Sequence, residues 1–238
     1  MTIGIALLVS AVIIYLIQIL LFHNSHETFF LLFQDLAFLP LEVVLISFIL
    51  EKYLSKREKL LKFRQMQVVI SAFYANVGAA LIQNFSPFNT NFYKLKEEFG
   101  TEQDLIYEKK KKLNFALDFD YEMDSRAGNL SDLNKFLLTK KSYILSMFEN
   151  PNLMEHDHFT DMLWAVYHVL DELENRNTFT ELPENDMDHL SLDIKRAYEL
   201  VIKEWVGYMI HLKQEYPYLF SLAIRKSPFS NISKVIFQ

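Results

Sequence analysis

The stretch that decides the fold is residues 3–22, IGIALLVSAVIIYLIQILLF, which contains no charged residue. A helix rises about 1.5 Å per residue, so roughly 20 residues cross the hydrocarbon layer of a bilayer, which is about 30 Å thick. A secretory signal peptide is the alternative, but the chain starts with Met1-Thr2 and no basic residue. The apolar run is also too long for a signal peptide, and no small-residue cleavage site follows it. We therefore expect a retained membrane-spanning helix.

A second apolar run covers residues 29–50 and contains sixteen Leu, Ile, Val and Phe residues. Each of these contributes about −0.3 to −0.6 kcal/mol to insertion, whereas a carboxylate at the helix centre costs about 2.5 to 3.5 kcal/mol. The sum favours insertion even though Asp35 and Glu42 lie in the run. Because only residues 23–28 connect the two runs, we predict an antiparallel two-helix transmembrane hairpin over residues 1–50, with helices at about 3–22 and 29–50.

A basic segment follows the second run at residues 51–65, whereas the connection at 23–28 contains no Lys or Arg. The positive-inside rule then places the basic segment, the N-terminus and everything after residue 65 in the cytoplasm. Basic side chains beside a membrane can also contact anionic lipid headgroups. The basic residues of this juxtamembrane segment are Lys52, Lys56, Arg57, Lys59, Lys62 and Arg64.

Residues 66–238 are long enough for a compact cytosolic domain, and their pattern predicts an all-α fold. The whole chain has only five Gly, too few for a domain rich in β-hairpins. We expect helices at residues 66–85, 130–148, 155–176, 188–216 and 218–226, and further helical segments within 92–128. The helix at 130–148 has Ser131 or Asp132 as its expected N-cap. The helix at 66–85 continues from the basic segment, and whether it joins the second spanning run without a break stays open.

Two of the expected helices carry apolar residues at spacings of three and four, which predicts buried faces. Each face is wide enough to pack on two neighbours, so we expect a bundle of four to six helices. The first face consists of Phe159, Met162, Leu163, Val166, Val169, Leu170 and Leu173. The second consists of Leu190, Ile194, Ala197, Val201, Trp205, Tyr208 and Leu212.

Charge and composition exclude several function classes. Residues 66–238 contain 18 Lys and Arg against 25 Asp and Glu, so no nucleic-acid partner is expected. The chain has no Cys, which excludes disulfides, thiolate metal sites and a cysteine nucleophile. It also lacks a Gly-rich phosphate loop, G-x-S-x-G, H-E-x-x-H and the kinase motifs. The cofactor therefore stays unknown, and a non-enzymatic role is favoured.

The second apolar run contains four intramembrane candidates: Gln34, Asp35, Pro40 and Glu42. The two acids are seven residues apart, which places them within about 20° of each other and about 10 Å apart along a helix. Pro40 can kink that helix. In an oligomer, such acids form rings that attract cations. The alternative is a re-entrant or interfacial helix in which Glu42 is protonated or paired with Gln18, since intramembrane acids are not specific to channels.

One side of the expected helix at 155–176 carries four potential metal ligands: His158, Asp161, His168 and Glu172. His and carboxylates at these spacings are typical of metal sites in helical bundles. The stripe lies about 110° from the centre of the apolar face, which favours a solvated or interface face instead. A site across helices could be completed from beside the buried face of the helix at 188–216 by His189, Asp193 and His211.

Three functions fit these observations. The leading hypothesis is a two-pass integral membrane protein whose cytosolic helical domain acts as an interaction or regulatory module for a protein partner. Self-association is expected as well, because the polar residues of the second run favour protein neighbours over lipid. The alternatives are an oligomeric cation channel gated by the cytosolic domain and a membrane-tethered metal-binding enzyme.

Overall fold

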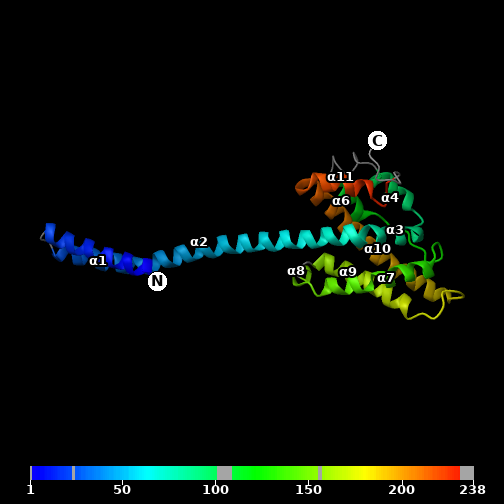
Figure 1. Cartoon of the computed structure of the whole chain (residues 1–238), viewed down its shortest axis with the longest axis horizontal. Coiled ribbons are helices and arrows are strands. Elements are labelled where there is room, and N and C mark those ends of the chain that lie inside the picture. Colours follow the sequence, from blue (N-terminus) through cyan, green and yellow to red (C-terminus); the bar gives the residue numbers. More distant parts are fainter. Residues whose placement is uncertain (1, 23–24, 101–108, 155–156, 231–238) are drawn as a thin grey trace. The chain divides into compact units, whose positions relative to one another are not determined.

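The computed structural model describes residues 2–22, 25–100, 109–154 and 157–230 (Figure 1). The chain divides into two compact units, Met1–Leu61 and Lys62–Gln238. Every element assigned among the described residues is helical, and the only strand-like feature there is an isolated bridge between Asn89 and Met123. The predicted all-α class is therefore confirmed.

The first unit contains α1 (Thr2–Phe22) and the larger part of α2 (Ser25–Phe73), which continues as a helix through Pro40. The Tyr15 hydroxyl of α1 donates a hydrogen bond to Asp35 Oδ2 of α2 at 3.2 Å, so the two helices lie side by side here (Figure 1).

One helical stretch of the described residues, His26–Phe88, is long and apolar enough to cross a membrane. Its most apolar 18-residue window has a mean hydropathy of 2.0 and no buried residue. Among the described residues, α1 contributes a shorter apolar stretch, Val9–Leu20. The structure thus supports one spanning candidate by length and composition. The predicted two-helix transmembrane hairpin is not established by it.

The second unit begins within α2 and continues through a π-helix, η1 (Tyr74–Gly78), then α3 (Ala79–Phe85) and a 3₁₀ turn, η2 (Ser86–Phe88). The predicted helix at 66–85 therefore exists and is continuous with the second apolar run. Its π-helical segment was not predicted. The remaining helices are α4 (Phe92–Phe99), α6 (Lys109–Asp118), α7 (Leu130–Phe148), α8 (Pro151–Met154), α9 (Asp157–Glu174), α10 (Glu184–Glu215) and α11 (Pro217–Arg225).

Two helix starts differ from the sequence expectation. Asn129, rather than Ser131 or Asp132, caps α7: its side-chain oxygen accepts the backbone N–H of Asp132 at 3.2 Å. Asp132 lies in the first turn, where a carboxylate is also favourable. The helix expected from residue 188 starts four residues earlier, at Glu184, where Pro183 is the N-cap and the carboxylates of Glu184 and Asp186 suit the first turn.

The core of the second unit is built around α10, which packs against α9, α6, α11 and α3 (Figure 1). Both predicted apolar faces, the seven residues on α9 and the seven on α10, are buried. Burying a large apolar side chain stabilises a fold by about 1.5–3 kcal/mol. These two faces therefore supply a large part of the driving force for assembling the domain.

The π-helix places Tyr74 inside this core. Its hydroxyl donates a hydrogen bond to the Val201 carbonyl at 2.9 Å, and its ring stacks on Tyr208 with centroids 5.0 Å apart. The ring also covers Gly78: a Cβ at that position would lie 2.2 Å from Tyr74 Cδ1. Because the ring is held on two sides, position 78 has no room for a side chain.

We therefore expect Gly78→Ala to destabilise the domain by about 1–3 kcal/mol, the usual cost of overpacking a core. Gly207→Ala is the matched control, since it also adds one methyl to a helix but meets no atom within 4 Å. It should be neutral or stabilising by up to about 1 kcal/mol. Thermal unfolding of the full chain in detergent, followed by circular dichroism, measures both. An unchanged unfolding midpoint for Gly78→Ala would contradict this account.

Candidate functional site

The intramembrane candidates lie on α2, where Gln34, Asp35, Pro40 and Glu42 are all exposed on the protein surface. Asp35 accepts the hydrogen bond from Tyr15. No hydrogen bond or ion pair joins Glu42 to Gln18 among the described residues, so the pairing considered from the sequence is not formed. The two acids thus differ: Asp35 has a partner on α1, whereas Glu42 is exposed.

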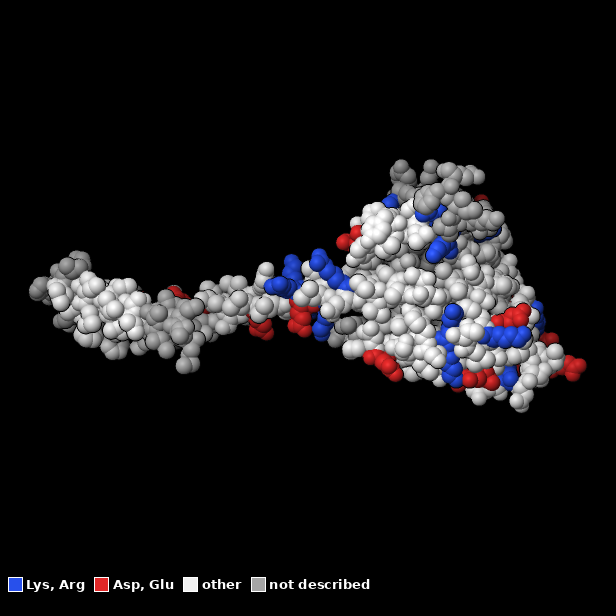
Figure 2. Space-filling model, viewed as in Figure 1, with Lys and Arg blue, Asp and Glu red and all other residues white. Residues whose placement is uncertain are grey.

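The basic residues of 51–65 are also on α2. Lys52, Lys56, Arg57, Lys59, Lys62 and Arg64 are exposed. Figure 2 shows Lys and Arg gathered on this part of α2, whereas the apolar span before it is mostly white. The surface of the helix therefore changes from a largely apolar one, interrupted by Asp35 and Glu42, to one rich in basic residues.

The four predicted metal ligands on α9 do not form one site. His158 and Asp161 are exposed, and Glu172 accepts a hydrogen bond from Arg176 Nη1 at 2.8 Å. Among the described residues, His168 is the one of these four that groups with other potential ligands, and these come from α10. His211 does not join them, because about 33 Å of helix separates it from His189. Burial lowers the pKa of His211.

His168, His189 and Asp193 bring their ligand atoms within 4.8 Å of one another. Asp193 Oδ2 lies 3.3 Å from His168 Nε2 and 3.1 Å from His189 Nε2. The Asp193 side chain is only 3% exposed, whereas those of His168 and His189 are 44% and 53% exposed. The sequence placed Asp193 beside the buried face of α10. That prediction was wrong: the Asp193 side chain is buried, because α9 packs closely on that side of α10.

An ion pair joins the ends of the two helices that form this cluster. Arg176, just after α9, contacts Asp186 in the first turn of α10, with Nη2 2.7 Å from Oδ1 and Nε 3.2 Å from Oδ2. The hydrogen bonds from the guanidinium lower the pKa of the Asp186 carboxyl. This two-pronged contact fixes the α9–α10 connection and so the register of His168 against His189.

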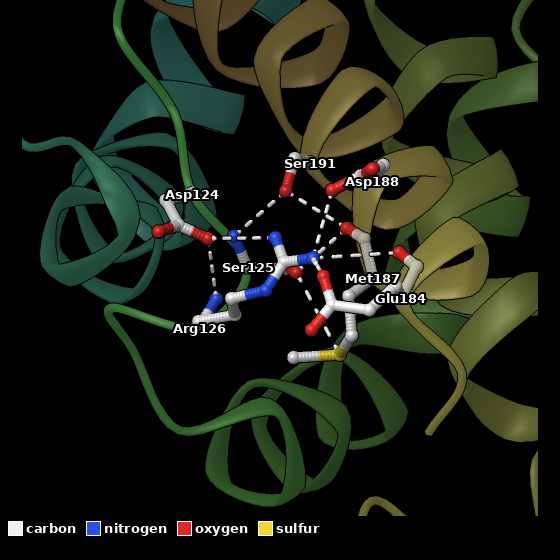
Figure 3. A network of polar contacts seen from close by, with 7 residues as sticks. All are labelled: Asp124, Ser125, Arg126, Glu184, Met187, Asp188 and Ser191. Carbon is white, nitrogen blue, oxygen red and sulfur yellow. Dashed lines mark hydrogen bonds and ion pairs between the residues drawn. The ribbon is translucent and has the colours of Figure 1, made fainter.

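A second network holds the start of α10 against the segment before α7 (Figure 3). Arg126 Nη2 lies 2.6 Å from Glu184 Oε2 and 2.8 Å from Asp188 Oδ1. The buried Ser125 hydroxyl donates to the Met187 carbonyl at 2.7 Å, and the Ser125 backbone N–H donates to Ser191 Oγ at 2.9 Å. These contacts span the two turns that carry His189.

The second unit also contains a cavity of about 150 Å³ that sequence reasoning missed. Its walls are mainly apolar and include Ser71, Tyr74, Trp205, Tyr208, Leu212 and Lys226. The Ser71 hydroxyl is buried and has no hydrogen-bond partner. No sequence signal could have found this cavity, because its walls combine the continuous stretch α2–η1–α3 with the distant helices α10 and α11.

Comparison with known proteins divides the chain in the same way as its structure does. A family model described as the C-terminal helical domain of uncharacterized protein MJ1433 matches residues 62–225, and one for its N-terminal helical domain matches residues 1–54. The chain belongs to the MJ1433 family. Uncharacterized protein MJ1433 of Methanocaldococcus jannaschii is 37% identical over 238 residues, covering 98% of this chain and 94% of that protein. No solved structure matches significantly.

The Arg176–Asp186 contact yields a pH-dependent prediction for this MJ1433-family domain. Because the Asp186 pKa is lowered in the folded state, its stabilisation is present above its unfolded pKa of about 3.9 and is lost as the pH falls through the lowered value. We expect Arg176→Gln to cost about 1 kcal/mol at pH 7, with the gap to wild type shrinking as the pH falls below the unfolded pKa of about 3.9.

Chemical denaturation at pH 7 and at a pH below about 3.9 measures this difference in the free energy of unfolding. Lys135→Gln is the control, because it removes an exposed helical ion pair, 3.4 Å long, from α7. It should change stability by no more than about 0.5 kcal/mol. A gap for Arg176→Gln that is the same at both pH values would exclude Asp186 as its cause.

Proposed function

We propose that this chain is a two-pass integral membrane protein that carries a cytoplasmic helical domain, which acts as an interaction or regulatory module. The observation that supports it most is the surface of α2. Fifteen large apolar side chains between Phe29 and Leu50 are 45–71% exposed. Soluble monomers rarely expose a contiguous apolar surface of this extent, whereas lipid covers it without cost.

The second pass is α1. It has 21 residues, enough to cross the hydrocarbon layer, and contains no charged residue. Its Tyr15 hydroxyl provides a hydrogen bond to Asp35 of α2. Within a membrane, such a bond lowers the cost of burying a polar side chain, which supports packing of α1 on α2 inside the bilayer.

Orientation follows from the basic residues after the span. Six exposed Lys and Arg lie within residues 51–65, which favours a cytoplasmic location for the helical domain and for the N-terminus. Their charges also suit a surface of anionic lipid headgroups. The connection between α1 and α2 then lies outside.

The absence of cysteine allows a clean topology test by single-cysteine labelling. We expect Glu27→Cys, at the start of α2, to react with a membrane-impermeant maleimide in intact spheroplasts. Lys56→Cys, in the basic segment, should react only after the membrane is disrupted. Both residues are exposed, so burial in the protein does not limit labelling.

The same samples test membrane insertion itself. The protein should stay in the membrane pellet after extraction with alkaline carbonate. Release into the supernatant would exclude a spanning protein, whereas labelling of Lys56→Cys in intact spheroplasts would exclude this orientation.

The domain offers an aromatic patch for association, formed by α7 and α9. Trp164 is 54% exposed, and its ring lies 4.5 Å from that of Phe148 and 6.2 Å from that of Tyr167. Exposed Trp and Tyr in such a cluster are typical of the residues that dominate protein interfaces. We assign this patch to contact with a second copy of the chain, since the polar residues of α2 also favour self-association in the membrane.

Self-association predicts a mass above 28.2 kDa for the protein in mild detergent, after correction for bound detergent. Trp164→Ala should weaken the assembly at least about tenfold. Tyr218→Ala on α11 is the control, because Tyr218 is 71% exposed but lies outside the patch. A monomeric wild type would contradict self-association, and an oligomer insensitive to Trp164→Ala would exclude the patch.

No contact among residues 2–22 and 25–61, the described part of the first unit, favours the cation-channel alternative. It requires Asp35 and Glu42 to face a common pore, and Asp35 is instead hydrogen-bonded to Tyr15 within the chain. The membrane-tethered metal enzyme, in the form predicted from His158, Asp161, His168 and Glu172, lacks a site at which these four meet.

A further inference from the structure

We propose that His168, His189 and Asp193 form a binding site for one divalent transition-metal ion on the helical domain. The three residues supply two imidazole nitrogens and one carboxylate oxygen from the facing helices α9 and α10. The site lies wholly within the second unit. It is therefore independent of the membrane role proposed above, and it differs from the four-residue stripe on α9.

The spacing of the ligand atoms fits a common metal centre. Zn²⁺ binds His nitrogen at about 2.0–2.1 Å and carboxylate oxygen at about 2.0–2.2 Å, which makes tetrahedral ligand atoms about 3.3 Å apart. The two contacts to Asp193 Oδ2 are 3.3 Å from His168 and 3.1 Å from His189. All three ligand atoms lie within 4.8 Å of one another, so an ion could be held by side-chain adjustment without moving either helix.

The hydrogen bonding of Asp193 Oδ2 also supports a metal site. This oxygen is buried and accepts no hydrogen bond, although both imidazoles are close to it. Arg196 does not compensate, since its Nη1 lies 3.6 Å from the other oxygen, Oδ1, and its side chain is 64% exposed. A buried carboxylate oxygen without a partner is costly. A metal ion held between this oxygen and the two imidazole nitrogens removes that cost.

The alternative source of positive charge is the imidazoles themselves. If both were protonated, each would form an ion pair with Asp193, and no metal would be required. Neither imidazole forms a hydrogen bond with Asp193 Oδ2, and this favours a bound metal ion over two protonated imidazoles. The metal-binding measurements below distinguish the two.

The ligand set defines the class of metal. Two imidazoles and one carboxylate suit Zn²⁺ and also Fe²⁺ and its neighbours in the first transition row, whereas Mg²⁺ and Ca²⁺ favour oxygen ligands. Three protein ligands leave at least one coordination position open. Because both imidazoles are about half exposed, that position faces solvent and is accessible to water or to an oxygen ligand.

The site is also preorganised. His189 and Asp193 are four residues apart on α10, so they share one face of that helix. The Arg176–Asp186 pair and the Arg126 network hold the start of α10, as described above. Metal binding therefore requires no refolding, and the ligands are held by rigid helices instead of loops.

The test uses the full-length chain in detergent, without a polyhistidine tag and after treatment with EDTA. Zn²⁺ binding is measured by equilibrium dialysis with elemental analysis, and Co²⁺ is added separately to record its visible absorption. We expect one Zn²⁺ per chain and a Co²⁺ spectrum of low coordination number. His168→Gln, His189→Gln and Asp193→Asn should each weaken binding at least about tenfold.

His158→Gln is the matched control, because it removes an exposed His from α9 outside the cluster. It should bind Zn²⁺ as the wild type does. Zn²⁺ should also raise the unfolding midpoint of the wild type and of His158→Gln, but not that of the cluster variants, because only a folded-state site couples binding to stability.

Two results would overturn the proposal: no stoichiometric Zn²⁺ in the wild type, or binding that is unchanged in His168→Gln and His189→Gln. These two variants decide the question even if Asp193→Asn does not fold, since both His side chains are half exposed. None of these outcomes depends on membrane insertion or on self-association, so the proposed function is tested separately.

Discussion

Burial of the α10 face is the constraint on which the helical domain depends. This helix, Glu184–Glu215, supplies twelve buried residues and packs against α9, α6, α11 and α3. Its apolar side chains lie at the three-and-four spacing that requires neighbours on both sides. Tyr74 of the π-helix and the Arg126 and Arg176 ion pairs all contact α10 or its first turns. Even the candidate metal site is built on its edge.

The single helix α2 changes from an exposed to a partly buried surface along its length. Along α2, the side chains from Phe33 to Gln65 are exposed, first on a largely apolar surface and then on a charged one. From Met66 onward, one side of the helix is buried at Met66, Ile70 and Phe73. A one-sided apolar pattern is that of a helix packing on a protein core, whereas the largely apolar surface that precedes it suits the lipid contact proposed for that segment. The boundary between the two MJ1433 family models falls in the same region.

The candidate metal site shows why functional groups are harder to predict than helices. The sequence placed His158, Asp161, His168 and Glu172 together, because residues on one helix face have a fixed spacing. The structure combines only His168 with two residues of α10, and it engages Glu172 with Arg176 instead. Ligands that come from two helices depend on the rotation and offset of those helices. The spacing of residues along the chain predicts neither the rotation nor the offset of two packed helices.

The sequence by itself determined the all-α class, the two apolar runs, the basic segment and the buried faces of α9 and α10. These features are local, since each follows from composition or from a period of 3.6 residues within one segment. Tertiary structure alone decided the π-helix that inserts Tyr74 beside Gly78, the burial of Asp193 and its meeting with His168. Each of these depends on atoms from helices far apart in the sequence, whose relative positions are set by how the side chains of the core fit together.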